Sequence, residues 1–374
     1  MNRLKGAPPA MLDVRRNKFD LMRLLAAVAV LYTHAWALAI GNLDAEPIRL
    51  LLGKTPGDIG VDLFFVTSGF LVTASFMNKP HLGRFLWARF VRIYPALVVA
   101  VALTVLLGLA LTNLPADQYL GDWHTRHYLF SNMTLLGGER HGLPGVFADA
   151  PFGTVSGNLG YANGSLWTLP YEVRLYLGLA LLGLVGLSVF RNRLESTMRV
   201  AVTLLALAGA IGVAFISFGY DIKHSTDAAV RFMSLFFAGG AFYLWRDRIR
   251  LSWLVFFISI ALFGGLLWLD QRIAHSAYAL ALPYWVLCVA YLPIAGRAAV
   301  ALPADYSYGL YIYHWPIMQT LVQGVEGVNW PTVFVVGLFL SFIMAYTSWH
   351  LVEKRALQLK KLAWGKPAEA KRRL

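Results

Sequence analysis

The sequence predicts an all-α membrane protein, a polytopic bundle of about ten transmembrane helices with both termini in the cytoplasm. Composition is the first observation behind this prediction. Of the 374 residues, 58% are hydrophobic and 14% are charged, and the mean hydropathy is +0.57. A soluble chain of this length needs more charge to cover its surface. The second and third observations are repeated apolar runs and Lys and Arg residues concentrated in alternate connections.

Ten apolar runs are long enough to cross a bilayer as helices. In chain order they are 19–40, 58–77, 95–112, 166–189, 199–219, 227–244, 252–269, 276–294, 304–323 and 331–352. Pro95 is expected to open the third helix, and Pro170 suits the start of the fourth. The connection 113–165 is longer than a turn requires and is expected to contain a short interfacial helix in HYLFSNMTLL.

The positive charges predict the orientation. Of the 33 Lys and Arg residues, 24 lie in six segments: 1–18, 78–92, 191–199, 246–250, 295–300 and 354–374. Alternate connections are therefore basic, which predicts that these segments are cytoplasmic and accounts for the net charge of +13 without a nucleic-acid partner. The basic start lacks a small-residue cleavage site, so we expect a cytoplasmic tail over 1–18, a membrane domain over 19–353 and a second basic tail over 354–374.

Two ionisable residues share the first apolar run. Arg23 and His34 are eleven positions apart, which places them on one helix face about 16 Å apart along the axis. Taken singly, a snorkelling arginine and a core histidine bonded to a neighbouring helix are ordinary structural explanations. Together on one face they indicate a polar path into the membrane.

A basic stretch, RFLWARFVRIYP (84–95), follows the second run and is expected to be a cytoplasmic loop. Its Arg89 and Arg92 are three positions apart and suit a phosphate, because guanidinium groups bind phosphate bidentately. Ordinary topology-determining charge is the alternative. The single cysteine, Cys288, excludes a disulfide framework and a cysteine-based metal site, and no metal is expected.

Three further stretches place polar or aromatic side chains in or beside apolar runs. GVDLFFVTSGF (60–70) contains Asp62 and Ser68, and SLWTLPYEVRLY (165–176) places Glu172 in the first turn of a helix. SYGLYIYHWP (307–316) aligns Tyr308, Tyr311 and either His314 or Trp315 on one stripe. Helix packing and helix-dipole stabilisation are the structural explanations, but a second intramembrane histidine favours function.

Taken in chain order, these five stretches resemble the integral-membrane acyltransferase-3 family, from Phe19 to about Leu357. The chain departs from the family pattern in HLVEKRAL, where Arg355 replaces a frequent proline. The resemblance implies a membrane O-acyltransferase of the bacterial inner membrane. It would move an acyl group, usually acetyl from acetyl-CoA, to a hydroxyl of an extracytoplasmic carbohydrate or glycolipid. Acetyl-CoA would be a co-substrate, and no permanently bound cofactor is expected.

The resemblance also implies roles for individual residues. His34 and Glu172 would be catalytic, and Arg23, Arg89 and Arg92 would bind acyl-CoA. The remaining motif residues would bind or support substrate: Asp62, Ser68, Trp167, Tyr176, Tyr311 and His314. Histidine titrates near neutrality, so His34 can accept a proton from a hydroxyl or pass on the acyl group. The spacing of Arg23 and His34 is comparable to the length of the pantetheine arm of CoA.

A transporter is the alternative function. In it, His34, Glu172 and His314 would form a proton relay across the membrane. The phosphate-suited arginines would then have no purpose, which favours the acyltransferase.

Overall fold

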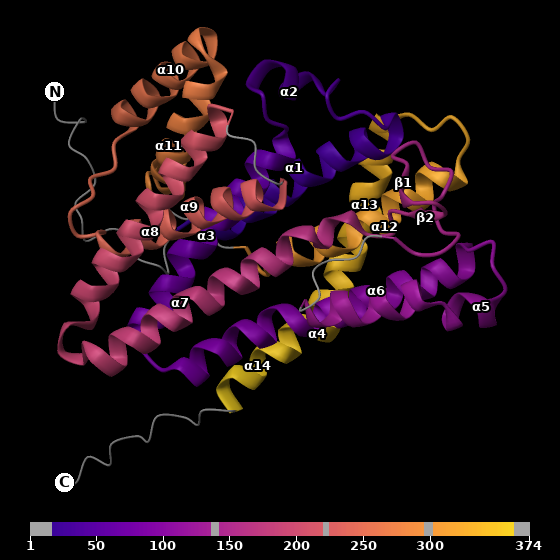
Figure 1. Cartoon of the computed structure of the whole chain (residues 1–374), viewed down its shortest axis with the longest axis horizontal. Coiled ribbons are helices and arrows are strands. Elements are labelled where there is room, and N and C mark those ends of the chain that lie inside the picture. The colour runs from indigo at the N-terminus through magenta and orange to yellow at the C-terminus, as the bar shows by residue number, and fades with distance from the viewer. Residues whose placement is uncertain (1–16, 136–141, 220–223, 295–301, 363–374) are drawn as a thin grey trace. The chain divides into compact units, whose positions relative to one another are not determined.

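The computed structural model describes residues 17–135, 142–219, 224–294 and 302–362, and these are nearly all helical (Figure 1). The helices are α1 (Phe19–Ile40), α2 (Pro47–Leu52), α3 (Pro56–Asn78), α4 (Leu82–Leu111), α5 (Ala116–Gly121), α6 (Trp123–Thr134), α7 (Leu169–Val189), α8 (Leu194–Ser217), α9 (His224–Leu244), α10 (Trp253–Leu269), α11 (Gln271–Tyr291), α12 (Ser307–Gly324), α13 (Trp330–Ser348) and α14 (Lys354–Leu362). A hairpin pairs β1 (Thr154–Ser156) with β2 (Leu159–Gly160) antiparallel.

Some predicted basic positions lie outside the described residues. They are residues 1–16 of the expected N-terminal tail, residues 363–374 of the C-terminal tail, and Arg140, Lys223 and Arg297. Helix α14 begins where the membrane domain was expected to end.

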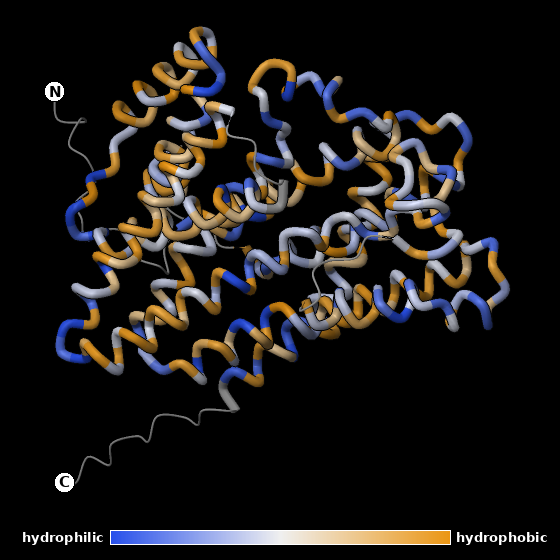
Figure 2. Tube along the Cα trace, viewed as in Figure 1, coloured by the Kyte–Doolittle hydropathy of each residue, from blue (hydrophilic) through white to orange (hydrophobic). Residues whose placement is uncertain are grey.

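The structure confirms a polytopic helical membrane protein. Each of the ten apolar runs forms a helix, and hydrophobic residues follow the helices (Figure 2). In the described part of the chain, seven helical stretches are long and apolar enough to cross a bilayer: Phe19–Ile40, Pro56–Asn78, Leu82–Leu111, Gly164–Val189, Arg191–Ser217, Gln271–Tyr291 and Trp330–Lys360. The other three runs form α9, α10 and α12, and α10 has 17 residues without a charged side chain.

The expected start of the third helix was wrong. Helix α4 begins at Leu82 and contains Pro95 in its interior, so Arg84, Arg89 and Arg92 lie on a helix and not in a loop. His81 caps the start, with Nδ1 accepting a hydrogen bond from the backbone N–H of Arg84 at 3.3 Å. The arginines interrupt the apolar run, but the buried residues between them repeat at helical spacing (Phe85, Ala88 and Val91). Neighbouring groups can satisfy the carbonyl freed by an interior proline in a membrane bundle.

Two compact units divide the chain. Unit 1 comprises Met1–Thr33, Leu43–Pro80 and Arg174–Ser307, and unit 2 comprises His34–Asn42, His81–Val173 and Tyr308–Leu374. Helices α1, α7 and α12 contribute residues to both.

Unit 1 is built on a close crossing of α3 and α9. A Cβ on Gly69 would lie 1.8 Å from the carbonyl oxygen of Phe236, and one on Gly239 would lie 2.1 Å from that of Val66. Backbone-to-backbone contact of this kind requires glycine and is a common way for helices to pack in membranes. Beside it, the rings of Phe65 and Phe232 stack with centroids 4.0 Å apart.

Unit 2 is built around α4, which packs against α6 and α14. Helix α6 occupies most of the stretch where a short helix was expected. The buried Tyr119, on α5, donates a hydrogen bond from its hydroxyl to the Val105 carbonyl of α4 at 3.0 Å. The β1–β2 hairpin and the 3₁₀ turn Gly164–Thr168 precede α7 in the same unit.

Candidate active site

Two histidines predicted separately from the sequence form a pair in unit 2. The Nδ1 atom of His34, on α1, lies 2.6 Å from Nε2 of His314, on α12. Their ring planes are within 16° of each other, and the centroids are 4.9 Å apart. His314 is completely buried and His34 is half-buried, so the pair combines a fixed partner with a more accessible imidazole.

His314 has two further polar neighbours. Its Nδ1 lies 3.0 Å from the carbonyl oxygen of Leu310, one turn earlier on α12. Its Nε2 also lies 3.2 Å from the hydroxyl of Ser165, in the 3₁₀ turn. Both ring nitrogens of this buried histidine are therefore occupied, as burial of a polar group requires.

The 3₁₀ turn is held against α12 by a buried asparagine. The Oδ1 atom of Asn163 accepts from the backbone N–H of Ser165 at 3.1 Å, and its Nδ2 donates to the carbonyl of Ile312 at 2.9 Å. Pro316 follows Ile312 by four positions and has no N–H to give that carbonyl. Asn163 thus supplies the hydrogen bond that Pro316 removes, and it fixes Ser165 beside His314.

Trp315 completes the surroundings of His34. Its ring meets the His34 ring edge-on, with centroids 4.7 Å apart, and its Nε1 donates to the carbonyl of Tyr161 at 3.0 Å. A Cβ on Gly164 would lie 2.7 Å from the Trp315 ring. Glycine at 164 therefore lets the turn approach the indole that packs on His34.

Glu172 lies near the tyrosines of α12 in unit 2. Its carboxylate interacts electrostatically with Tyr308 and Tyr311. The hydroxyl of Tyr311 lies 2.7 Å from that of Thr168, and the ring of Trp167 packs edge-on against Tyr171 at 6.0 Å. The catalytic role expected for Glu172 stays a prediction.

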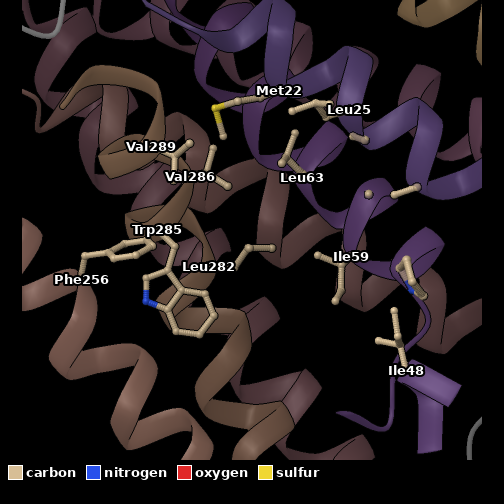
Figure 3. Close-up of a pocket in the computed structure, with 14 residues that line it drawn as sticks. Met22, Leu25, Ile48, Ile59, Leu63, Phe256, Leu282, Trp285, Val286 and Val289 are labelled. Carbon is tan, nitrogen blue, oxygen red and sulfur yellow. The ribbon is translucent and has the colours of Figure 1, made fainter. Parts of the chain in front are cut away.

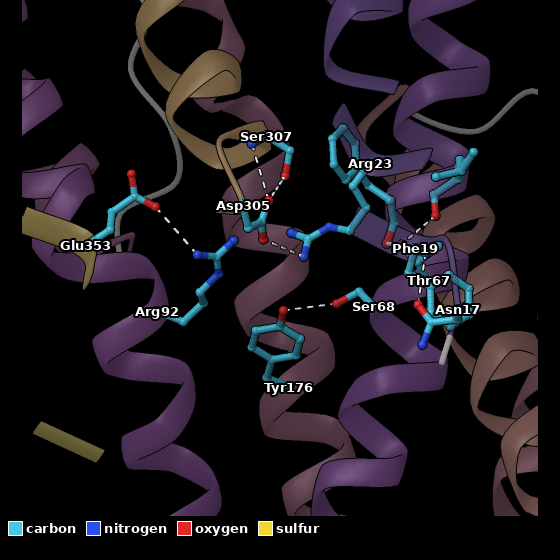
Figure 4. A network of polar contacts seen from close by, with 12 residues as sticks. Asn17, Phe19, Arg23, Thr67, Ser68, Arg92, Tyr176, Asp305, Ser307 and Glu353 are labelled. Atoms are coloured by element: carbon cyan, nitrogen blue, oxygen red, sulfur yellow. Dashed lines mark hydrogen bonds and ion pairs between the residues drawn. The ribbon is translucent and has the colours of Figure 1, made fainter. Parts of the chain in front are cut away.

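The arginines of α4 lie in a cationic group that includes a lysine from α14. The Lys360 ammonium interacts electrostatically with both Arg89 and Arg92. Arg92 Nη1 lies 3.5 Å from the Glu353 carboxylate, as Figure 4 shows, and its guanidinium lies over the Tyr308 ring at 5.6 Å. Three cations and one buried carboxylate leave this surface positive, which suits an anionic ligand.

Glu353 is positioned by a π-helical turn, Trp349–Glu353, between α13 and α14. The turn buries the carboxylate, whose Oε1 accepts from the Ser348 hydroxyl at 3.1 Å. Such turns are frequently found at functional positions.

In unit 1, Arg23 is already paired. Its Nη1 lies 3.1 Å from Oδ2 of Asp305, whose other carboxylate oxygen accepts from Ser307 (Figure 4). The Arg23 guanidinium also lies 5.7 Å from the centroid of the Phe64 ring. An anionic ligand at Arg23 therefore competes with Asp305.

Asp62 is completely buried and belongs to an ion-pair cluster in unit 1. Its Oδ1 accepts from Arg231 Nε at 2.7 Å, and Lys54 Nζ lies 3.6 Å from its Oδ2. Asp58 adds a second carboxylate, 3.6 Å from Arg231. Burial lowers the pKa of the Lys54 ammonium, and the Arg231 charge lowers it further. Two acids and two bases balance within the cluster, so it ties α3 to α9 electrostatically.

The structure brings Ser68 and Tyr176 together, with their hydroxyls 2.9 Å apart in unit 1 (Figure 4). The same unit contains a pocket of about 460 Å³ between side chains of α1, α3 and α11 (Figure 3). None of its lining residues is charged. This pocket suits hydrocarbon and has no group for proton transfer.

Several polar residues of these contacts were missed by the sequence analysis: Asn163, Ser165, Asp305, Glu353 and Lys360. Asn163 and Ser165 had a local signal, because they directly precede the LWTLP stretch. Asp305 likewise lies two residues before the start of SYGLYIYHWP. Lys360 had none beyond basic charge.

Comparison with known proteins agrees with the resemblance. The family described as "Acyltransferase domain" matches residues 16–350. The O-acetyl transferase of Shigella phage Sf6 is 29% identical over 359 residues, covering 92% of this chain and 96% of that protein. Nodulation protein 10 of Rhizobium leguminosarum bv. viciae is 31% identical over 378 residues, covering 92% and 94%. The peptidoglycan O-acetyltransferase OatA of Listeria monocytogenes is 24% identical over 381 residues, covering 89% of this chain and 54% of that protein. No solved structure gave a significant match.

Proposed function

The chain belongs to the acyltransferase-3 family and is an acyltransferase, and from this premise we propose that it transfers acetyl from acetyl-CoA to a hydroxyl of an extracytoplasmic glycan. Relatives named as an O-acetyl transferase and a peptidoglycan O-acetyltransferase support the acetyl group and a carbohydrate acceptor. The transporter alternative gains no support from these relatives.

The observation that carries the proposal is the His34–His314 pair. His34 is half-buried, and its partner holds one of its ring nitrogens, so the other can act as a general base. The acceptor hydroxyl gives its proton to His34 as its oxygen attacks the thioester carbonyl. The carbon–sulfur bond then breaks, and the leaving CoA thiolate takes the proton back from the imidazolium. The products are an acetyl ester and free CoA.

The donor phosphates would bind at the cationic group of unit 2. Arg89 and Arg92 present guanidinium groups three positions apart on α4, and Lys360 adds an ammonium from α14. CoA is polyanionic and does not cross the bilayer unaided, so its phosphates need cations at the cytoplasmic face. Arg23, in unit 1, would bind a donor phosphate only by exchanging Asp305 for it.

The orientation that this chemistry needs is the one that the charges predict. We propose ten transmembrane helices in a catalytic membrane domain over 19–353, with both termini in the cytoplasm. The β1–β2 hairpin and the 3₁₀ turn beside His314 would then lie toward the outside, where the acceptor arrives. The inner membrane of a bacterium provides acetyl-CoA on one side and glycan on the other.

The experiment that tests the function uses purified protein in lipid vesicles. CoA should raise the thermal midpoint, because a ligand that binds only the folded state stabilises it. CoA lacking its 3′-phosphate should raise it less. Acetyl-CoA should then be consumed with one acceptor from a panel of O-antigen, exopolysaccharide and peptidoglycan fragments, and the product should be an alkali-labile ester. No stabilisation and no consumption across the panel would contradict the proposal.

A further inference from the structure

His314 lies next to the proposed base, is completely buried and presents both ring nitrogens to defined partners. We propose that His314 is a positioning residue that holds His34 in the tautomer protonated on Nδ1, so that the lone pair for proton transfer lies on Nε2. The inference rests on the proposed function for its catalytic consequence, but the tautomer itself does not.

The Leu310 carbonyl fixes the first proton of the pair. A carbonyl oxygen only accepts hydrogen bonds, so His314 Nδ1, at 3.0 Å from it, carries a proton. In the neutral imidazole the other nitrogen, Nε2, is then an acceptor. The Leu310 carbonyl, a fixed part of α12, thus sets the tautomer of His314.

The next step is the contact between the rings. His34 Nδ1 and His314 Nε2 are 2.6 Å apart, and two lone pairs cannot face each other at that distance. Because Nε2 of His314 is an acceptor, the proton lies on Nδ1 of His34. Ser165 lies farther away, at 3.2 Å, and its hydroxyl can point to the same lone pair without changing this assignment.

The opposite arrangement would need a doubly protonated His314. That would place a cation in a completely buried ring whose neighbours are a carbonyl, a hydroxyl and another imidazole. A buried charge without an opposite charge is far more costly than a neutral hydrogen bond. The neutral pair is therefore the resting state.

For catalysis, this tautomer makes Nε2 of His34 the nitrogen that accepts the proton. The hydrogen bond made by one ring nitrogen decides which nitrogen is available for chemistry. When His34 takes a proton on Nε2, its bond to His314 becomes charge-assisted and shorter, which stabilises the imidazolium. His314 thus acts through His34 and need not touch either substrate.

The first arm of the test reads the tautomer without turnover. Protein carrying ¹⁵N-labelled histidine is studied in lipid vesicles by solid-state NMR, and the His34 signals are assigned by their loss in His34→Gln. The wild-type spectrum should show Nδ1 of His34 protonated and Nε2 unprotonated. In His314→Leu the Nε2-protonated form should appear. A wild-type ring protonated on Nε2 would overturn the inference whether or not His34 is catalytic.

The second arm reads catalysis. His314→Leu should lower kcat roughly tenfold to a hundredfold and leave the KM for acetyl-CoA unchanged. His314→Gln, which can place an amide oxygen near the position of Nε2, should recover most of the loss. Thr320→Val, which removes a hydroxyl that donates to the Pro316 carbonyl on the same helix, is the matched control and should equal wild type. If Gln is no better than Leu in equally stable proteins, His314 serves packing alone and the inference is wrong.

Discussion

At the scale of single residues, the charge of the α4 arginines is the feature most open to test. Arg89 and Arg92 share one helix with Arg84, but among the three only Arg89 and Arg92 interact with Lys360. A cation that binds donor phosphate and a cation that only orients the chain in the membrane differ in what they contribute to substrate affinity. The two roles can be separated by kinetics.

Arg89→Ala should raise the KM for acetyl-CoA tenfold to about a hundredfold, because a lost charge-assisted contact costs roughly 1.5–3 kcal/mol. Arg89→Lys should recover only part of the lost affinity for acetyl-CoA, since an ammonium does not reproduce the bidentate contact of a guanidinium. The difference in KM between Arg89→Ala and wild type should shrink at high salt, because salt screens the phosphate contact that only wild type makes. Arg84→Ala is the control on the same helix. If all three variants had the KM of wild type, Arg89 would contribute to membrane topology and not to donor binding.

Glu353→Gln should change the donor KM in the opposite direction. The carboxylate faces Arg92 at 3.5 Å, and removing its charge frees the guanidinium for phosphate while the amide keeps a hydrogen-bond acceptor for Ser348. We expect the KM for acetyl-CoA to fall roughly threefold to tenfold. Steady-state kinetics with limiting acetyl-CoA measure it. A KM that rises or stays constant would mean that Arg92 serves Glu353 and not the donor.

At the level of helices, most elements could be predicted from the sequence, and the start of α4 is the largest discrepancy. Each apolar run became a helix, because hydrophobic length dominates the choice of structure in a bilayer. The start of α4 was missed by thirteen residues, from 95 to Leu82, because arginines and an interior proline looked like a loop. Asn163 was missed because its partner, the Ile312 carbonyl, is distant in the chain. The Trp349–Glu353 turn was missed because a π-helical turn has no clear sequence pattern.

The α3–α9 crossing makes a prediction about glycine. Gly69→Ala should destabilise the protein by about 1–3 kcal/mol, because the new Cβ would meet the Phe236 carbonyl oxygen at 1.8 Å and the helices must separate. Thermal unfolding in detergent measures the loss. Gly264→Ala on α10, where nothing lies within 4 Å, is the control and should be unchanged or slightly more stable. Equal midpoints for the two variants would contradict this packing.

For the whole molecule, the distribution of Lys and Arg predicts the orientation in the membrane, and cysteine labelling can test that orientation. Cys288 is buried, so a single exposed cysteine placed elsewhere reports its own side of the membrane. Ser156→Cys, in β1, should react with an impermeant maleimide on intact spheroplasts, and Asn192→Cys, between α7 and α8, should react only after lysis. The reverse pattern would place the termini outside and remove the cytoplasmic donor site.

The candidate site shows the limit of sequence reasoning at this scale. His34 and His314 were each singled out as intramembrane histidines, but their 2.6 Å contact joins residues 280 positions apart. Asp305 and Glu353 were not expected as partners of Arg23 and Arg92, because no local pattern records which carboxylate meets which cation. Motif residues are visible in the sequence, and their pairings appear only in the fold.

General-base catalysis by His34 is tested by the turnover number of His34→Gln in lipid vesicles, with acetyl-CoA and the glycan acceptor that wild type uses. We expect kcat to fall at least about a hundredfold, because general acid–base catalysis contributes roughly 10²–10⁴-fold. The stabilisation by CoA should be retained, and the exposed-histidine control His124→Gln should equal wild type. A His34→Gln enzyme with a kcat within about threefold of wild type would show that His34 is not the general base and is a packed core histidine.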